Sequence, residues 1–180
     1  MLRHAIGAFV RGNVRDRLAD RVAQHLRERL PDDHVVLARY APRDHGERIP
    51  VVVVGRHRIF VLEPRDDDGD LLCYQDHWYR QASGVRAHPL ADSPSLRARR
   101  NAARIRSDLG TGGFLNVGID ASVVLTRARP LDVRSSCVPV IAGLDPLVRH
   151  VVRDLAAEPT PERTRALADA LARNITLAAV

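Results

Sequence analysis

Glu63 and Arg65 have the residue types and the spacing that best suit chemistry in this sequence. They follow two apolar runs, at 49–54 and 59–62, that are separated by a short polar break. Both runs are too short for helices and rich in β-branched residues, which predicts a β-hairpin covered on both faces. Side chains alternate along a strand, so residues 63 and 65 point to the same side. An acid and a base placed in this way could form a metal-and-phosphate site, or they could be solvated charges at a strand end.

Hydrophobic spacing places this pair within a series of helices and strands. Leu18, Val22 and Leu26 recur at steps of four, which predicts an amphipathic helix over residues 14–30. Ser93 suits a helix N-cap, with Pro94 at the first helical position. The predicted helices are at 14–30, 93–109, 145–156 and 160–174, and the predicted strands are at 34–40, 49–54, 59–62, 71–74, 77–81, 119–126 and 138–141. This order predicts an α/β fold in which a mixed central sheet is flanked by helices.

Positive charge dominates the composition. The net charge is +6, and all 28 basic residues are arginines. Such an excess attracts phosphates, although charge alone also fits a basic protein with no polyanion partner. The densest basic stretch is the predicted helix at 93–109, where Arg97 lies beside the stripe of Arg100 and Arg104. These side chains are either phosphate contacts or a solvated helix face.

Length and cysteine content narrow the class of protein. The 180 residues fit one domain with enough chain for a core. Cys73 and Cys137 are isolated, so they indicate neither a zinc site nor a disulfide framework. No apolar run approaches the roughly 20 residues that a membrane-spanning helix requires. We therefore expect a cytoplasmic protein without a membrane partner.

Five stretches, in this order, resemble the nuclease-related domain (NERD) family of the restriction-endonuclease-like PD-(D/E)xK superfamily. They are ADRVAQHLRERLPDDHVVL at 19–37, RIPVVVVGRHRIFVLEPR at 48–65, GDLLCYQDHWYR at 69–80, SPSLRARRNAARIRSDL at 93–109 and ASVVLT at 121–126. The resemblance implies a restriction-endonuclease-like mixed sheet. It also implies an N-terminal extension at 1–14, a NERD-like domain at 15–156, and a C-terminal helix at 157–180 that packs on the domain or extends it.

The resemblance implies a metal site of which only part is kept. In this superfamily, carboxylates from the first helix and two central strands hold Mg²⁺, and a lysine beside the last acid positions the attacking water. The helix acid falls at Asp20 and the (D/E)xK acid at Glu63, but the strand acid falls at Pro50. The lysine falls at Arg65, which is a poor base but binds phosphate well. A glutamine of the family falls at Arg97.

Two nearby acids could replace the carboxylate that is lost at Pro50. Glu47 has the opposite strand parity to position 50, so it would reach the site only through a bent turn. Asp44 lies further back in the same connection. Fewer acids and more arginines in the cleft predict weaker metal binding and stronger attraction to a phosphate backbone.

Three hypotheses follow for the function. The first is a non-catalytic NERD-like domain that needs no cofactor and binds DNA or RNA backbone, or serves as an interaction module. Its nucleic-acid contacts would be Arg65, Arg97, Arg100 and Arg104. The second is a divergent Mg²⁺-dependent nuclease in which Asp20 and Glu63 hold the metal. The third is a purely structural partner in an assembly, with another protein or with further copies of the chain.

Overall fold

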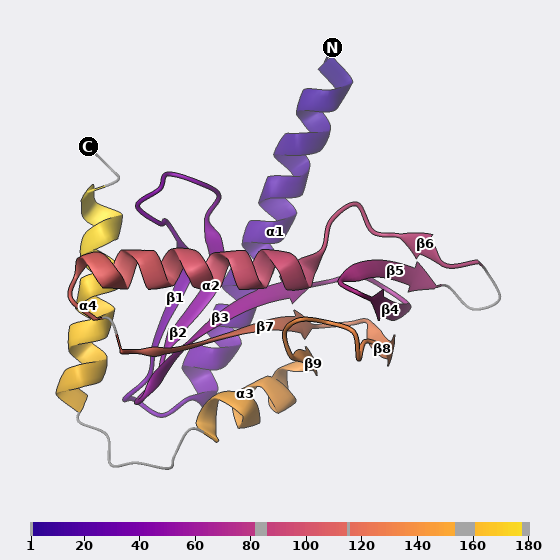
Figure 1. Ribbon diagram of the computed structural model, residues 1–180. Coiled ribbons are helices and arrows are strands. Elements are labelled where there is room, and N and C mark those ends of the chain that lie inside the picture. The colour runs from indigo at the N-terminus through magenta and orange to yellow at the C-terminus, as the bar shows by residue number, and fades with distance from the viewer. Residues whose placement is uncertain (1, 82–85, 115, 154–160, 178–180) are drawn as a thin grey trace.

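A computed structural model describes residues 2–81, 86–114, 116–153 and 161–177 (Figure 1). The elements are α1 Leu2–Arg29, β1 Val35–Tyr40, β2 Ile49–Val54, β3 Arg58–Arg65, β4 Asp70–Tyr74, β5 His77–Gln81, β6 His88–Pro89, α2 Pro94–Thr111, β7 Gly118–Leu125, β8 Arg129–Asp132, β9 Val140–Ala142, α3 Leu144–Val152 and α4 Pro161–Leu177. The end expected at residue 156 for the third helix lies outside the described residues. Among these residues, no helix is both long and apolar enough to cross a bilayer.

A five-stranded sheet in the order β1-β2-β3-β7-β9 forms the centre of the molecule. β2 and β3 are the predicted hairpin, with Val52 opposite Val61, and every residue of β2 is buried. β1 pairs antiparallel to β2, whereas β7 pairs parallel to β3 and β9 parallel to β7. The sheet is therefore mixed, as the order of elements predicts.

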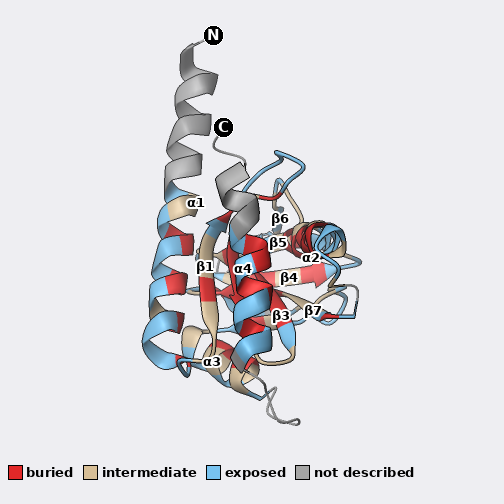
Figure 2. Cartoon of the chain, turned by 90° about the vertical axis from the view of Figure 1, so that its left-hand side faces the viewer, coloured by how far each residue is buried: buried red, intermediate tan, exposed pale blue. Residues whose placement is uncertain are grey.

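Helices cover both faces of this sheet. On one face, Val22 and Leu26 of α1 and Leu147 of α3 pack against alternate strand residues. On the other face, Ile105 of α2 and Leu167 of α4 pack against the residues between them. Figure 2 shows the buried strands lying between helices whose outer sides are exposed. This arrangement confirms the predicted α/β fold with a mixed sheet flanked by helices.

A second sheet of four strands, in the order β6-β5-β4-β8, lies beside the first. Its centre is the predicted β4–β5 hairpin, which turns at Gln75 and Asp76 with φ of 49° and 62°. Trp78 is buried there in a cluster with Val123 and Leu125 of β7, so it links the two sheets. The strands β6 and β8 were not predicted, because both are short and polar and contain proline, which is unfavourable within strands.

The helix α2 begins as predicted. The Ser93 side chain accepts a hydrogen bond from the Leu96 amide at 3.3 Å, and Pro94 occupies the first helical position. The buried side chains of α2 face the sheet, and Ser95 accepts a hydrogen bond from Trp78 Nε1 at 2.9 Å. These contacts fix the start of α2, and with it Arg97, against the ends of β3 and β5.

Candidate functional site

The strand β3 carries Glu63 and Arg65 toward the start of α2. Ile59 and Val61 of the same strand parity pack in the cluster that contains α2 and α4. Glu63 accordingly meets Arg97 of α2, with Arg97 Nη1 at 3.4 Å from Glu63 Oε1. Arg65 meets Asp92, which immediately precedes α2, with Nη1 at 3.2 Å from Oδ1. The two side chains thus reach the same segment, as the alternation of side chains along a strand predicts.

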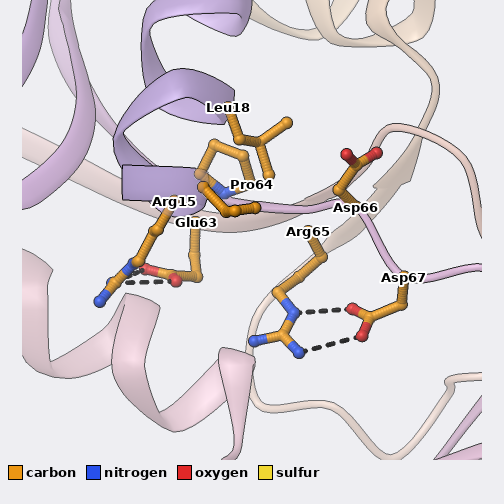
Figure 3. A pocket seen from close by; sticks show the side chains of 8 residues that line it. Arg15, Leu18, Glu63, Pro64, Arg65, Asp66 and Asp67 are labelled. Carbon is orange, nitrogen blue, oxygen red and sulfur yellow. Dashed lines mark hydrogen bonds and ion pairs between the residues drawn. The ribbon is translucent and has the colours of Figure 1, made fainter. Parts of the chain in front are cut away.

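Arg15 of α1 is the residue in closest contact with Glu63 (Figure 3). Its Nη2 donates to Glu63 Oε1 at 3.1 Å and to Oε2 at 3.2 Å. Its Nη1 donates to Glu47 Oε2 at 3.2 Å. One guanidinium therefore bridges two carboxylates, Glu63 in the interior and Glu47 at the surface.

Arg15 was not among the predicted site residues, although its position on the helix is informative. Arg15 lies three residues before Leu18 and four before Ala19, both of which face the sheet. A charged residue on this buried stripe needs a partner inside the protein. The phase alone predicts that Arg15 faces the sheet, but it does not identify Glu63 as the partner.

Burial controls the protonation of Glu63, whose side chain is 1% exposed. The loss of water raises its pKa above the ordinary glutamate value, and the charges of Arg15, Arg97 and Arg65 act in the opposite direction. Burial also lowers the pKa of Arg97. The charge on Glu63 therefore depends on its arginines, because a buried carboxylate without a partner takes up a proton.

A cavity of about 390 Å³ opens beside this cluster. Glu63 and Arg15 line it together with Leu18 and Arg65. Figure 3 shows Arg65 turned away from Glu63 toward Asp67, to which its Nε donates at 2.8 Å. Asp92 also pairs with Arg97. The arginines of this cavity are thus neutralised by acids of the protein itself.

Asp20, the expected helix acid, is not among the residues that contact Glu63 or line its cavity. Its side chain is 50% exposed and pairs with Arg39 of β1, whose Nε lies 3.2 Å from Asp20 Oδ1. The reason is helix phase, since Asp20 follows Ala19 and lies off the stripe that faces the sheet. The structure therefore does not assemble the expected pair of metal ligands.

The two acids considered as replacements at Pro50 are both held by arginines. Glu47 is 74% exposed and shares Arg15 with Glu63, and that guanidinium lowers its pKa. Asp44 accepts two hydrogen bonds of 2.7 Å from Arg104, which lower its pKa to about 2. Pro50 itself is buried in β2 and supplies no ligand.

The residues present do not fit a divalent cation in this arrangement. Mg²⁺ requires several oxygen ligands with free lone pairs, and Arg15 occupies the space between Glu63 and Glu47. Within the described part of the chain, no group of three or more His, Cys, Asp or Glu side chains could hold a metal ion. Glu63 therefore belongs to an ion-pair cluster in this fold.

The four arginines predicted to contact nucleic acid fall into two groups. Arg65, Arg97 and Arg104 are engaged with acids, as described above. Arg100 is exposed on α2, as are Arg99 and Arg106, which were not among the predicted contacts. No ion pair to these last three side chains is found among the described residues. Free positive charge therefore lies on the outer side of α2 and not in the Glu63 cavity.

Comparison with known proteins agrees with the resemblance seen in the sequence. A family model for the nuclease-related domain matches residues 15–126. No curated protein and no solved structure matches the chain. The matched segment contains α1 from Arg15 onward, the β2–β3 hairpin, α2 and β7. Because the match spans more than half of the sequence, the chain belongs to the nuclease-related domain family.

Proposed function

We propose that this protein is a nuclease-related domain that binds nucleic-acid backbone without cleaving it. One observation carries the proposal of inactivity: the Arg15 guanidinium pairs with both oxygens of Glu63, the carboxylate that a metal-dependent nuclease would need for its cation, and it also holds Glu47. A guanidinium neutralises the carboxylates, but it holds no water for attack on a phosphodiester.

A second feature supports the absence of hydrolysis. Arg65 stands where the resemblance places the lysine that positions water, and it donates to Asp67 and Asp92. Arginine is charged at all ordinary pH values, so it cannot serve as a base. The alternative nuclease based on Asp20 and Glu63 has no comparable support, because Asp20 pairs with Arg39.

The exposed arginines of α2 support backbone binding. Arg100 and Arg106 lie on the exposed side of this helix, and in the described part of the chain no acid pairs with them. The whole chain adds a net charge of +6. Unpaired arginines attract the phosphates of a nucleic acid whatever its base sequence, and their binding releases counterions from the nucleic acid. Arg65, Arg97 and Arg104 would then maintain the fold beneath this surface.

Cleavage of plasmid DNA and of labelled RNA with Mg²⁺ or Mn²⁺ tests the inactivity. We expect no turnover by the wild type above that of Glu63→Ala. Turnover by the wild type that disappears in Glu63→Ala would contradict the proposal. A second experiment compares the double variant Pro50→Asp/Arg65→Lys with a triple variant that also carries Arg15→Gln. The third change is needed because Arg15 would otherwise stay paired with Glu63. Calorimetry should detect Mn²⁺ binding only in the triple variant.

Fluorescence anisotropy with a labelled oligonucleotide at several salt concentrations tests the binding. The variant Arg100→Glu/Arg106→Glu should bind more weakly and reduce the slope of log K against log salt by about 2. A matched control is Arg163→Glu/Arg165→Glu, which changes the net charge equally on the exposed side of α4. Equal weakening by both variants would show a diffuse charge effect and not a surface on α2.

A further inference from the structure

The strand β7 has one edge that is only partly paired. On one side it pairs with β3 from Gly118 to Leu125, but on the other it pairs with β9 only from Val123 to Leu125. Within the described residues, no strand lies opposite the stretch 118–122 on the β9 side. Figure 1 shows this half of β7 at the front of the molecule, between α2 and α3.

The hydrogen bonds at the other end of β7 show which groups point to the open side. The Val123 amide donates to Pro139 O at 3.0 Å, and Leu125 O accepts from the Gly143 amide at 2.8 Å. Odd-numbered residues of β7 therefore direct their backbone groups toward β9. By the same alternation, the N–H and C=O groups of Ile119 and Ala121 point to the open edge, where the described chain supplies no partner.

A cavity of about 370 Å³ lies along this edge. Arg99 and Ala102 of α2 form one wall, His150 of α3 lies on another side, and Val138 closes one end. The Ile119 side chain points to the α2 side, because it packs in the same cluster as Ala102. The cavity thus offers two unpaired backbone positions next to a partly apolar pocket.

The charges along this cavity indicate which side chain of a bound segment would fit its α2 side. Arg99 is exposed, and no ion pair to it is found in the described structure. The acid that lines the cavity, Asp120, is already paired, with Oδ2 at 2.6 Å from Arg58 Nη1. The Cys137 amide donates to Asp76 at 2.8 Å, so Asp76 is occupied as well. Arg99 interacts electrostatically with Asp76, but it forms no ion pair within the described residues. An acidic side chain facing α2 could therefore form a direct ion pair with this arginine.

We infer that the open half of β7 binds an extended peptide segment of a partner protein, which adds a strand to the sheet and places an acidic side chain against Arg99. Strand addition of this kind takes its affinity from main-chain hydrogen bonds and its specificity from pockets for alternate side chains. This inference goes beyond the proposed binding of nucleic acid and does not depend on it. It assigns the interaction to the edge of β7 and not to the exposed side of α2.

A fluorescein-labelled hexapeptide, blocked at its C-terminus, with the sequence Thr-Glu-Thr-Glu-Thr-Glu is the probe. Its threonines favour an extended chain, and all of its glutamates lie on one face. Anisotropy should show saturable binding to the full chain, with an affinity that falls by about tenfold or more when lysine replaces glutamate. Arg99→Glu should reverse this preference, whereas the matched change Arg163→Glu should leave it unaltered.

The backbone ladder is tested separately from the charge. Two further probes carry N-methylated amides, one at its threonines and the other at its glutamates. Only alternate residues of an added strand donate hydrogen bonds to β7, so one of the two methylated probes should lose binding. Ala121→Pro removes an outward N–H from the protein itself, and if that variant fails to fold, the methylated probes still decide the question. Equal binding by both methylated probes and the parent, or no binding of the parent at millimolar concentration, would overturn the inference.

Discussion

Arg15 contacts one carboxylate inside the protein and another at its surface, and the two respond in opposite ways. Glu63 is 1% exposed, and its pKa is raised because burial outweighs the arginines around it. Glu47 is 74% exposed, and the same guanidinium lowers its pKa. Asp44, also at the surface, has a pKa of about 2 because Arg104 donates to both of its oxygens.

Contact with an arginine therefore does not by itself set the charge of a carboxylate. At the surface, water already stabilises the anion, so the arginine adds to that stabilisation. In the interior the arginine replaces lost water only in part. Glu63 therefore depends on its partners for its charge, whereas Glu47 and Asp44 do not. A metal site built on Glu63 would have to replace Arg15 and supply the same compensation.

The largest effect is expected from removing a buried partner. Arg97→Met should destabilise the protein by about 3 kcal/mol, because it leaves the buried Glu63 carboxylate with less compensation for its charge. Chemical denaturation at neutral pH measures this change. The control is Glu63→Leu/Arg97→Met, which removes both charges and should be more stable than Arg97→Met alone. A double variant less stable than the single variant would show that the buried pair contributes net stability.

A smaller effect is expected in the pH dependence of stability. The pKa of Glu63 is higher in the folded state than in the unfolded state. At pH values between these two pKa values, the folded state therefore binds one more proton than the unfolded state. Stability should then fall as pH rises from the unfolded pKa through the folded one, by no more than about 1.4 kcal/mol per pH unit for one proton. Glu63→Gln should lack this slope. The opposite slope in the wild type relative to Glu63→Gln would show that the arginines outweigh burial.

The smallest effect is expected at the surface. Asp44→Asn should cost less than about 1 kcal/mol, because an exposed ion pair is screened by water. The lowered pKa of Asp44 means that its contribution is present above the unfolded value and is lost as pH falls through about 2. NMR titration measures the pKa of the Asp44 carboxyl. Denaturation at pH values above and below that pKa measures its contribution to stability. A loss as large as that of Arg97→Met would remove the contrast between interior and surface.

Elements with strong local signals could be predicted from the sequence. The valine-rich runs predicted the β2–β3 hairpin, and Ser93 with Pro94 predicted the start of α2, because propensity and capping act within a few residues. The strands β6 and β8 were not predictable, since their pairing depends on distant partners and not on their own side chains. The division into two sheets is likewise a property of the packed chain.

The same division holds for the candidate site. The position of Glu63 at the end of a buried strand was predicted from the sequence, because strand parity is a local property. The contact of this carboxylate with Arg15, and not with Asp20, could be seen only in the folded chain. The two helix residues lie within a few positions of each other, so their roles depend on how α1 is rotated against the sheet. That rotation is set by the packing of Leu18 and Val22, which brings Arg15 into a cluster where a cation must compensate a buried charge.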